Sequence, residues 1–316
     1  MLPVTHPLAR ALPVLLLLGA SAPAGVRWGE EGHVITGRVA AAKLPAAMPA
    51  FFRSAADQLG WLNPEPDRWR SDSLVEMNEA FRYDHYLDLE VVPPAALEAA
   101  DRYTYLRALA QAGLERPERD AGLLPFRIVE LQQRLTTGFR LWREADDVTR
   151  GWLEQRILND AGILGHYVAD AANPLHTSVH HNGWNADFPN PDGFTTDRTL
   201  HWRFEGDYVR TAIALGDVLP LVPGEARTLG EVRAAVLSYL NESHGHLMAL
   251  YRLEADQPFG EATRSTAHHA FVARRLAFGA TMLRDLWWSA WVESGAPPTR
   301  DADFGDALPA TRPGGA

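Results

Sequence analysis

Two histidines and an aspartate stand close together in an otherwise apolar part of the sequence. The segment LGHYVADAANPLH contains His166, Asp170 and His176. Residues four apart on a helix project from the same face, so His166 and Asp170 can reach a single ion. Asn173-Pro174 is expected to end that helix, because proline disfavours the helical conformation in the residue before it. His176 follows two residues later, where the chain can fold back beside the same face.

A second pair of the same kind lies in LHWRFEGD, where His201 and Glu205 are again four residues apart. Such pairs also arise by chance in a chain with 12 histidines and 40 acidic residues. Either pair alone is therefore also compatible with a surface ion pair or a helix N-cap. Further candidate ligands favour a metal site: WGEEGH contains His33, PEPDRWR contains Asp67, and YDHYLDLE contains His85.

This set of candidate ligands consists of imidazoles and carboxylates, and the chain has no cysteine. Zinc accepts both kinds of ligand, and zinc sites that keep a water ligand are the catalytic kind. The absence of cysteine excludes thiolate zinc sites, disulfides and cysteine nucleophiles. Because the candidate ligands outnumber those that one tetrahedral ion needs, we expect more than one zinc ion.

The elements that must position these residues are expected to be helices. Apolar residues recur at three- and four-residue spacing in several stretches, and strand-like alternation is nearly absent. Proline and glycine cluster in a long predicted loop over residues 180–194. The sequence predicts a single all-α domain over residues 28–294, followed by a disordered tail over residues 295–316. The expected helices cover residues 34–44, 45–59, 103–112, 124–144, 151–172, 229–253 and 260–293.

The first residues indicate an export signal. His6 and Arg10 precede the apolar run ALPVLLLLGA, and small residues at 22–24 offer a cleavage site. The alternative is a buried N-terminal helix, since the run is too short to span a bilayer comfortably. We expect residues 1–24 to be a signal peptide, with cleavage as late as residue 27, and the protein to be secreted or periplasmic. No later run is apolar enough for a membrane span.

The overall charge limits the classes of partner. With 30 basic and 40 acidic residues the net charge is −10, which argues against broad electrostatic capture of nucleic acid through Lys and Arg. A small cationic pocket remains compatible with this charge. The sequence leaves the oligomeric state open.

Taken in order, the candidate ligands form a series of motifs: Trp-Gly-x-x-Gly-His, Asp-x-x-Arg, His-x-x-Asp, His-x-x-x-Asp-x5-His and His-x-x-x-acid. This series resembles that of the trinuclear-zinc, single-strand-specific nucleases of moulds and plants, the nuclease S-one/P-one family. That family shares a superfamily with bacterial zinc-dependent phospholipase C. The resemblance covers Trp28 to about Tyr208 by motif and the later helices by pattern. It implies the helical fold of this superfamily.

The resemblance also implies three bound zinc ions. The first would be held by Asp67, His85, His166 and Asp170; the second, bridged through Asp170, by His33 and the amino group and carbonyl of Trp28; the third by His176, His201 and Glu205. Bridged zinc ions about 3.5–4 Å apart can acidify a shared water and clamp the attacking and leaving oxygens of an in-line displacement. Asp67 would also orient the nucleophile.

Further residues match positions of the family that touch substrate. Arg70, three residues after Asp67, would grip a phosphate oxygen through its planar guanidinium. Tyr86 and Asp88 match positions where the nucleases stack against and hydrogen-bond a base. Core packing of Tyr86 and helix capping by Asp88 are the alternatives. Asn182 is a further candidate phosphate contact, although its spacing differs from that of the family.

Two features separate this chain from its apparent relatives. Glu205 stands where the nucleases usually have Asp and the phospholipases have Glu, whereas the short interval from Trp28 to His33 resembles the nucleases. The amino group of Trp28 can coordinate only if cleavage exposes it, and the preceding Gly-Val-Arg is a poor cleavage site.

The function expected from the sequence is that of an exported zinc-dependent phosphodiesterase. It would hydrolyse single-stranded DNA and RNA to 5′-monophosphates, with 3′-nucleotidase activity as a further candidate. One alternative is a zinc-dependent phospholipase C that acts on phosphocholine-type lipids. The other is a non-catalytic zinc-binding protein.

Overall fold

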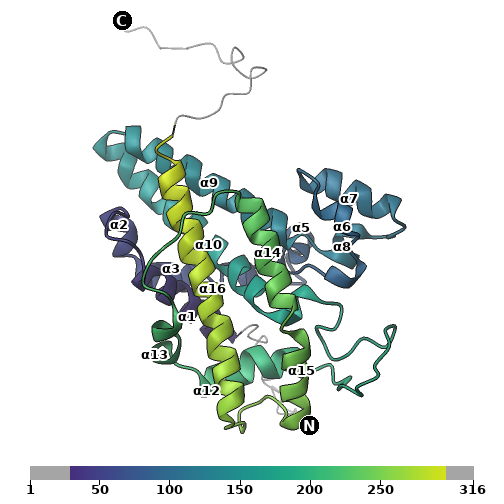
Figure 1. Ribbon diagram of the computed structural model, residues 1–316. Helices are drawn as coiled ribbons and strands as arrows, with labels where there is room; N and C mark the ends of the chain where they lie inside the picture. Colours follow the sequence, from purple (N-terminus) through teal and green to yellow (C-terminus); the bar gives the residue numbers. More distant parts are fainter. Residues whose placement is uncertain (1–28, 297–316) are drawn as a thin grey trace, which may run out of the picture.

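Helices account for all the regular structure of residues 29–296, the part of the chain that the computed structural model describes (Figure 1). The prediction of a single all-α domain is confirmed for these residues. The proposed signal peptide, Trp28 and the tail from residue 297 onward lie outside the described residues. None of the helices within residues 29–296 is long and apolar enough to cross a membrane.

Helix α10 (Asp147–Ala172) runs through the middle of the molecule and carries the first pair of candidate ligands (Figure 1). The side chain of Asp146 caps its start by accepting a hydrogen bond from the backbone N–H of Thr149 at 2.8 Å. Every residue from 160 to 172 is buried. The helix ends at Asn173, whose extended backbone (φ −85°, ψ 119°) is the conformation that a following proline favours.

Other helices surround α10 and bury it. It packs against α9 (Leu124–Glu144), α16 (Thr266–Glu293), α1 (Gly29–Ala42) and α3 (Ala56–Leu62). Leucine, valine, alanine and aromatic side chains from all of these helices form one continuous core. The indole N–H of Trp287 donates to the backbone carbonyl of Ala161 at 3.3 Å, which fixes α16 against α10.

Several predicted helices have the expected bounds and others are interrupted. Helix α9 begins and ends where the sequence predicts, and α10 begins four residues earlier because its capped first turn is polar. The predicted helix over residues 45–59 is wrong, since the extended backbone of Pro49 (φ −51°, ψ 142°) delays its start and the chain breaks again at Ser54-Ala55. The predicted helix over residues 229–253 is divided at Gly245-His246, and that over residues 260–293 starts late because Gly260 begins a turn.

The remaining elements are shorter. They are α2 (Ala50–Arg53), α4 (Glu65–Arg68), α5 (Val75–Phe81), η1 (Arg82–His85), η2 (Leu89–Val91), α6 (Pro94–Leu97), α7 (Arg102–Gln111), α8 (Pro117–Ala121), η3 (Pro174–Thr177), α11 (Leu200–Trp202), η4 (Arg203–Tyr208), α12 (Val209–Ala212), α13 (Leu215–Val218), η5 (Leu219–Leu221), α14 (Val232–His244) and α15 (Leu247–Asp256). The predicted loop over residues 180–194 is free of helix.

Candidate metal centre

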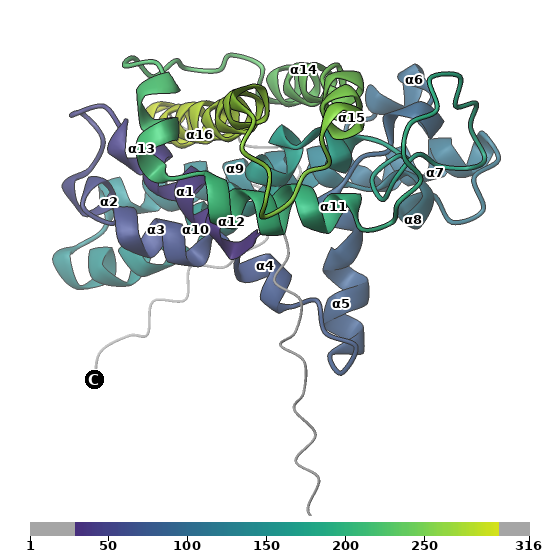
Figure 2. The same ribbon diagram turned by 90° about the horizontal axis from the view of Figure 1, so that it is seen from below.

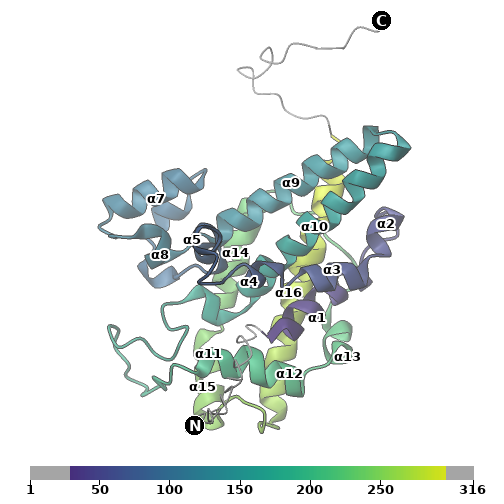
Figure 3. The same cartoon turned by 180° about the vertical axis from the view of Figure 1, so that it is seen from behind.

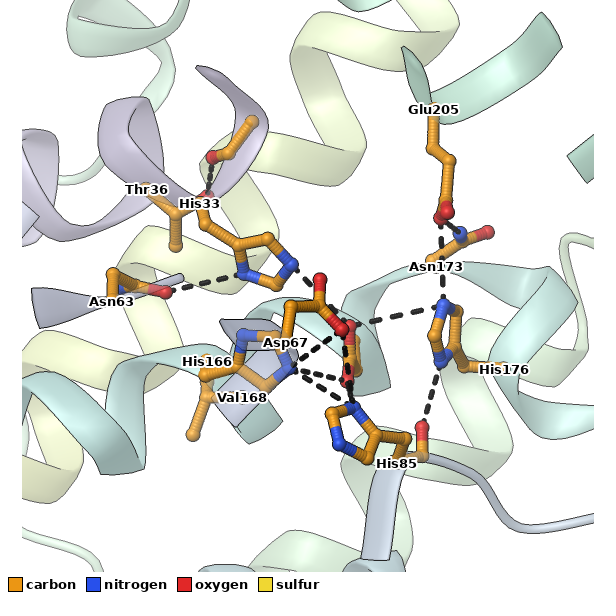
Figure 4. A network of polar contacts seen from close by, with 12 residues as sticks. His33, Thr36, Asn63, Asp67, His85, His166, Val168, Asn173, His176 and Glu205 are labelled. Carbon is orange, nitrogen blue, oxygen red and sulfur yellow. Dashed lines mark hydrogen bonds and ion pairs between the residues drawn. The ribbon is translucent and has the colours of Figure 1, made fainter. Parts of the chain in front are cut away.

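The first group of candidate ligands gathers around one oxygen of Asp170. Figure 4 shows Asp67, His85 and His166 of this group pointing toward one another. The Nε2 atom of His166 and the Nδ1 atom of His85 are 3.0 Å apart, and they lie 3.3 and 3.0 Å from Oδ2 of Asp170. Oδ1 of Asp67 is 4.0 Å from each of these nitrogens. Ligands about 2.0–2.1 Å from a tetrahedral zinc ion lie about 3.3 Å from one another. His85, His166 and Asp170 therefore have the separations of ligands to one ion, and Asp67 lies somewhat farther away.

A second group contains the three candidate ligands that follow α10 in the sequence. Nε2 of His201 is 3.1 Å from Nε2 of His176 and 2.9 Å from Oε2 of Glu205. Nε2 of His176 is 3.4 Å from the same carboxylate oxygen. Two imidazoles and one carboxylate thus face a single point, which leaves a fourth tetrahedral position for water or substrate.

His33 completes the centre and Asp170 joins its parts. Nε2 of His33 is 3.6 Å from Oδ1 of Asp170, and Nε2 of His176 is 3.7 Å from the same oxygen. His33 also forms a group with Asp67 and His166. The rings of His33 and His166 are stacked at a centroid distance of 4.1 Å. Three groups of histidine, aspartate and glutamate side chains could therefore hold metal ions. Each oxygen of Asp170 faces different imidazoles.

Separate elements deliver these side chains. His166 and Asp170 come from α10, while α4 supplies Asp67 beside it (Figure 3). The segment around His85 is tied to η3 because the backbone N–H of Leu87 donates to the carbonyl of His176 at 2.9 Å. The turn at η3 is fixed by the side chain of Asn173, which accepts a hydrogen bond from the N–H of Leu175 at 3.0 Å.

His201 and Glu205 lie on one continuous helical run that contains a π-helical segment. The α-helical turn of α11 passes into the π-helical residues of η4, from Arg203 to Tyr208, and then into α12. Such π-helical insertions are rare and occur often at functional sites. The sequence predicts the pairing of His201 with Glu205 through regular helical spacing; the structure brings them together across this wider turn.

Hydrogen bonds outside the groups fix the orientation of the imidazoles (Figure 4). Nδ1 of His33 donates to the side-chain carbonyl of Asn63 at 3.2 Å, which directs Nε2 toward Asp170. Nδ1 of His176 donates to the backbone carbonyl of His85 at 2.7 Å and leaves its Nε2 toward Glu205. Partners of this kind hold the tautomer and ring orientation that a metal ion requires.

Two carboxylates of the centre, Asp170 and Glu205, have pKa values held below their usual range. Burial alone would raise the pKa of Asp170, but the adjacent imidazoles of His176 and His166 hold it well below its usual range. Burial opposes ionisation of Glu205 in the same way, and its pKa is nevertheless held below the usual value by His201 and His176. Both side chains are therefore ready to act as anionic ligands.

The pKa values of His33 and His85 are shifted in one direction and that of His176 in the other. Burial, followed by the neighbouring His166, lowers the pKa of His33 to about 3, and burial also lowers the pKa of His85 well below its usual value. These imidazoles are neutral, as metal ligands must be. Burial likewise opposes protonation of His176, but the carboxylates of Asp170 and Glu205 raise its pKa to about 9. Metal binding must therefore displace a proton from His176.

A cavity of about 530 Å³ opens onto the centre. Its wall includes candidate ligands from both groups, whereas His33 and His166 are fully buried behind it. The side chains of Arg70, Arg82 and Arg119 also line it, together with the carboxylic side chains of Asp67, Asp88, Asp170 and Glu205. Nη1 of Arg70 is 3.5 Å from Oδ1 of Asp67. Its Nε is buried without a hydrogen-bond partner among the described residues, which leaves a donor for an anion.

The predicted substrate-contacting residues all line this cavity. Asp88 begins η2 but its side chain makes no capping hydrogen bond, and its Oδ1 is buried without a partner within residues 29–296. Burial, followed by the charge of Glu90, raises the pKa of Asp88 to about 8. Tyr86 packs partly against the core and also lines the cavity. Asn182 lies at the exposed edge of the same cavity.

Some residues of the site carry no recognisable signal in the sequence. Arg82, Arg119 and Trp202 line the cavity, but none of them belongs to a ligand-spaced motif. His181, which the sequence gives no role, lies on the cavity wall. His180 is buried against Trp184, with stacked rings at 3.8 Å.

Trp28, expected to contribute its amino group, is outside the described residues. The candidate centre is therefore defined by His33, Asp67, His85, His166, Asp170, His176, His201 and Glu205. The chain matches no protein-family model and no curated protein.

Proposed function

We propose that this protein is an exported zinc-dependent phosphodiesterase that hydrolyses single-stranded DNA and RNA to 5′-monophosphates. The observation that carries the proposal is the position of Asp170, whose two oxygens face separate groups of imidazoles beside a cavity lined by arginine. The donor set of imidazole and carboxylate suits zinc. Zinc ions held by these groups would polarise the phosphoryl oxygens and acidify water.

The protein's own side chains bind and orient the phosphodiester. The unpartnered Nε of Arg70 donates to a non-bridging phosphate oxygen, and Asp67 holds the guanidinium in place at 3.5 Å. The carboxylate of Asp67 also orients the attacking water and accepts its proton. The amide of Asn182 contacts a neighbouring phosphate at the edge of the cavity.

The base of the nucleotide is bound by Tyr86 and Asp88, which follow His85 in the sequence and line the same cavity. The ring of Tyr86 offers a stacking face for any base, and its hydroxyl is held by the backbone carbonyl of Arg119 at 2.5 Å. Asp88 retains its proton near neutral pH because of its raised pKa, so it can donate one hydrogen bond to a base. An unstacked base fits this arrangement, which favours single-stranded substrates.

Activity assays with a matched pair of variants test the proposal. Zinc-loaded protein should cleave single-stranded DNA and RNA to products that end in 5′-phosphate, lose this activity with chelator, and regain it with zinc. Arg70→Gln should reduce kcat/KM by about 10- to 100-fold, since it removes a charge-assisted hydrogen bond to phosphate. Arg107→Gln, at an exposed position of α7, should leave kcat/KM unchanged. Failure of the zinc-loaded protein to cleave any nucleic acid would refute the proposal.

A phospholipase C is the second candidate, and one surface feature favours it. Helix α5 projects from the body of the molecule (Figure 2). In the sequence it lies between Arg70 and Arg82, which both line the cavity. Leu74, Val75 and Met77 are 47%, 58% and 40% exposed there. An apolar face beside the cavity could meet a lipid surface. Release of phosphocholine from phosphatidylcholine vesicles, without cleavage of nucleic acid, would establish this candidate instead.

A further inference from the structure

A second cavity, of about 830 Å³, lies in a groove between α14 and α16. Both helices pack against other core helices, α14 on α9 and α10 and α16 on α10 and α1. The loop over residues 221–230, which leads from α13 toward α14, borders the groove at one end (Figure 1). This α14–α16 groove shares no lining residue with the cavity at the metal centre. A ligand in this groove would therefore bind apart from the metal centre.

Aromatic and aliphatic side chains form the walls of the α14–α16 groove. The rings of Tyr239 and Phe278 are stacked at a centroid distance of 4.4 Å, with 25° between their planes. The hydroxyl of Tyr239 donates to the backbone carbonyl of Val168 at 2.8 Å, which anchors this pair to α10. Ala235 and Met282 extend the apolar surface along the groove. The walls thus suit an alkyl chain.

One buried cation in the α14–α16 groove has an unpaired hydrogen-bond donor. Arg275 is only 7% exposed, and its guanidinium lies 4.7 Å from the centroid of the Phe278 ring. Its Nη1 is buried without a hydrogen-bond partner, and no carboxylate of the described chain lies within ion-pair distance of it. A buried guanidinium stays charged, and leaving its donors unpaired is costly. Burial lowers the pKa of Arg275, in keeping with this cost.

The ligand that satisfies both features has an anionic head and an apolar body. A carboxylate matches the planar, bidentate geometry of a guanidinium. The lining contains three arginines, Arg227, Arg274 and Arg275, and two acids, Glu231 and Glu242, so a monoanion fits its charge better than a dianionic phosphate monoester does. The volume lies within the range of about 300–1,000 Å³ that is usual for small-molecule sites.

We propose that the α14–α16 groove binds an alkyl monocarboxylate, a fatty acid of medium chain length. The carboxylate pairs with Arg275, and the alkyl chain lies over Phe278 and Tyr239 toward Ala235 and Met282. The proposal does not depend on the metal centre.

Calorimetric titration of the zinc-loaded full-length protein tests this inference. Dodecanoate below its micelle concentration should bind with one site per chain, and dodecanol, which has the same chain without the charge, should bind at least about tenfold more weakly. Acetate, which has the charge without the chain, should show no saturable binding. Absence of saturable dodecanoate binding, or equal affinities for dodecanoate and dodecanol, would overturn the proposal.

Two substitutions test which residues of the groove bind the carboxylate and which bind the alkyl chain. Arg275→Gln should weaken dodecanoate at least about tenfold and leave dodecanol unchanged, whereas Arg252→Gln, at an exposed position of α15, should alter neither. Ala235→Trp should fill the groove and weaken both ligands. Should Arg275→Gln fail to fold, Ala235→Trp decides the matter, because undiminished dodecanoate binding in a filled groove contradicts the assignment.

Discussion

At Asp170, one carboxylate faces four imidazoles. Its Oδ2 lies within 3.3 Å of nitrogens of His85 and His166, and its Oδ1 lies within 3.7 Å of nitrogens of His33 and His176. A carboxylate that contacts two ligand groups at once is the side chain through which bound ions would be coupled. The strongest effects of substitution are therefore expected at this residue.

Asp170→Asn should remove the bridging charge and lower the zinc content of the purified protein below that of the parent chain. Because loss of an orienting partner alone costs about 10- to 100-fold in metal affinity or activity, loss of this ligand should cost at least about 100-fold in kcat/KM. Elemental analysis and activity assays measure both effects. Asp147→Asn, at an exposed position of the same helix, is the control. Full zinc content and activity in Asp170→Asn would show that Asp170 is not a ligand.

Asn63 is expected to affect zinc binding through its hydrogen bond to His33. Asn63→Ala removes the acceptor for Nδ1 of His33, so this hydrogen bond no longer fixes the tautomer and orientation of the ring. Zinc affinity should fall by about 10- to 100-fold, as measured by competition with a chromogenic chelator. Asn63→Asp keeps an acceptor oxygen at this position and should retain more of the affinity. Equal affinities for Asn63→Ala and the parent chain would contradict an orienting role.

Asp88 makes stability depend on pH. Its carboxyl ionises near its ordinary pKa in the unfolded chain, but in the folded protein burial raises the pKa to about 8. Between about pH 4 and pH 8 the folded state binds the extra proton, so this group destabilises the fold progressively as the pH rises. Asp88→Asn should leave the melting temperature unchanged near pH 4 and raise it near pH 8. Thermal denaturation at both pH values checks this, and an equal shift at both would disprove the assignment.

At the scale of elements, the close contact between α10 and the end of α3 positions the centre. A Cβ atom at Gly165 would collide with the side-chain amide of Asn63, the partner of His33. The absence of a side chain at Gly165 therefore lets α10 approach the segment that orients the first histidine. This contact connects the packing of two helices to the geometry of a ligand.

Gly165→Ala should displace Asn63 and strain the contact between the two helices. Overpacking of this kind costs about 1–3 kcal/mol of unfolding free energy, and zinc affinity should fall as well. Gly151→Ala, on the same helix with nothing within 4 Å of its added Cβ, provides the matched control and should be neutral or slightly stabilising. Urea denaturation and zinc competition measure the two quantities. A Gly165→Ala chain as stable as the control would contradict the argument.

The elements also show what the sequence can predict. Regular helical spacing is local, so the pairing of His166 with Asp170 and the end of α10 at Asn173-Pro174 follow from adjacent residues. Tertiary packing brings His33, Asp67 and His85 beside α10. In the sequence, only the order of the motifs, which resembles that of the nuclease family, indicates this. Arg70 is predicted from its spacing to Asp67, but Arg82, Arg119 and the π-helical segment at η4 are absent from the prediction, because none of them has a periodic or spaced signature.

At the scale of the whole molecule, the centre brings together buried side chains from both halves of the described chain. Without metal, ionisable carboxyl groups and imidazoles share a small buried volume, and their desolvation opposes folding. Bound ions reverse this effect, since a ligand that binds only the folded state stabilises it by mass action. The cysteine-free chain has no disulfides, so metal is the remaining cross-link available to it.

Removal of metal should lower the melting temperature substantially. One ion at about 1,000 times its dissociation constant contributes about 4 kcal/mol, and 1 kcal/mol corresponds to about 2–4 °C in a domain of this size class. Chelation should therefore lower the melting temperature by about 10 °C or more, and stoichiometric zinc should restore it. Differential scanning calorimetry measures this change. Magnesium serves as the control, because imidazole ligands do not suit it.

Anomalous diffraction above the zinc absorption edge, from crystals of the zinc-loaded protein, tests the central claim most directly. The account predicts a peak among His85, His166 and Asp170, a second beside His33, and a third among His176, His201 and Glu205. Crystals without a zinc peak at these side chains, or with zinc only on the surface, would contradict it.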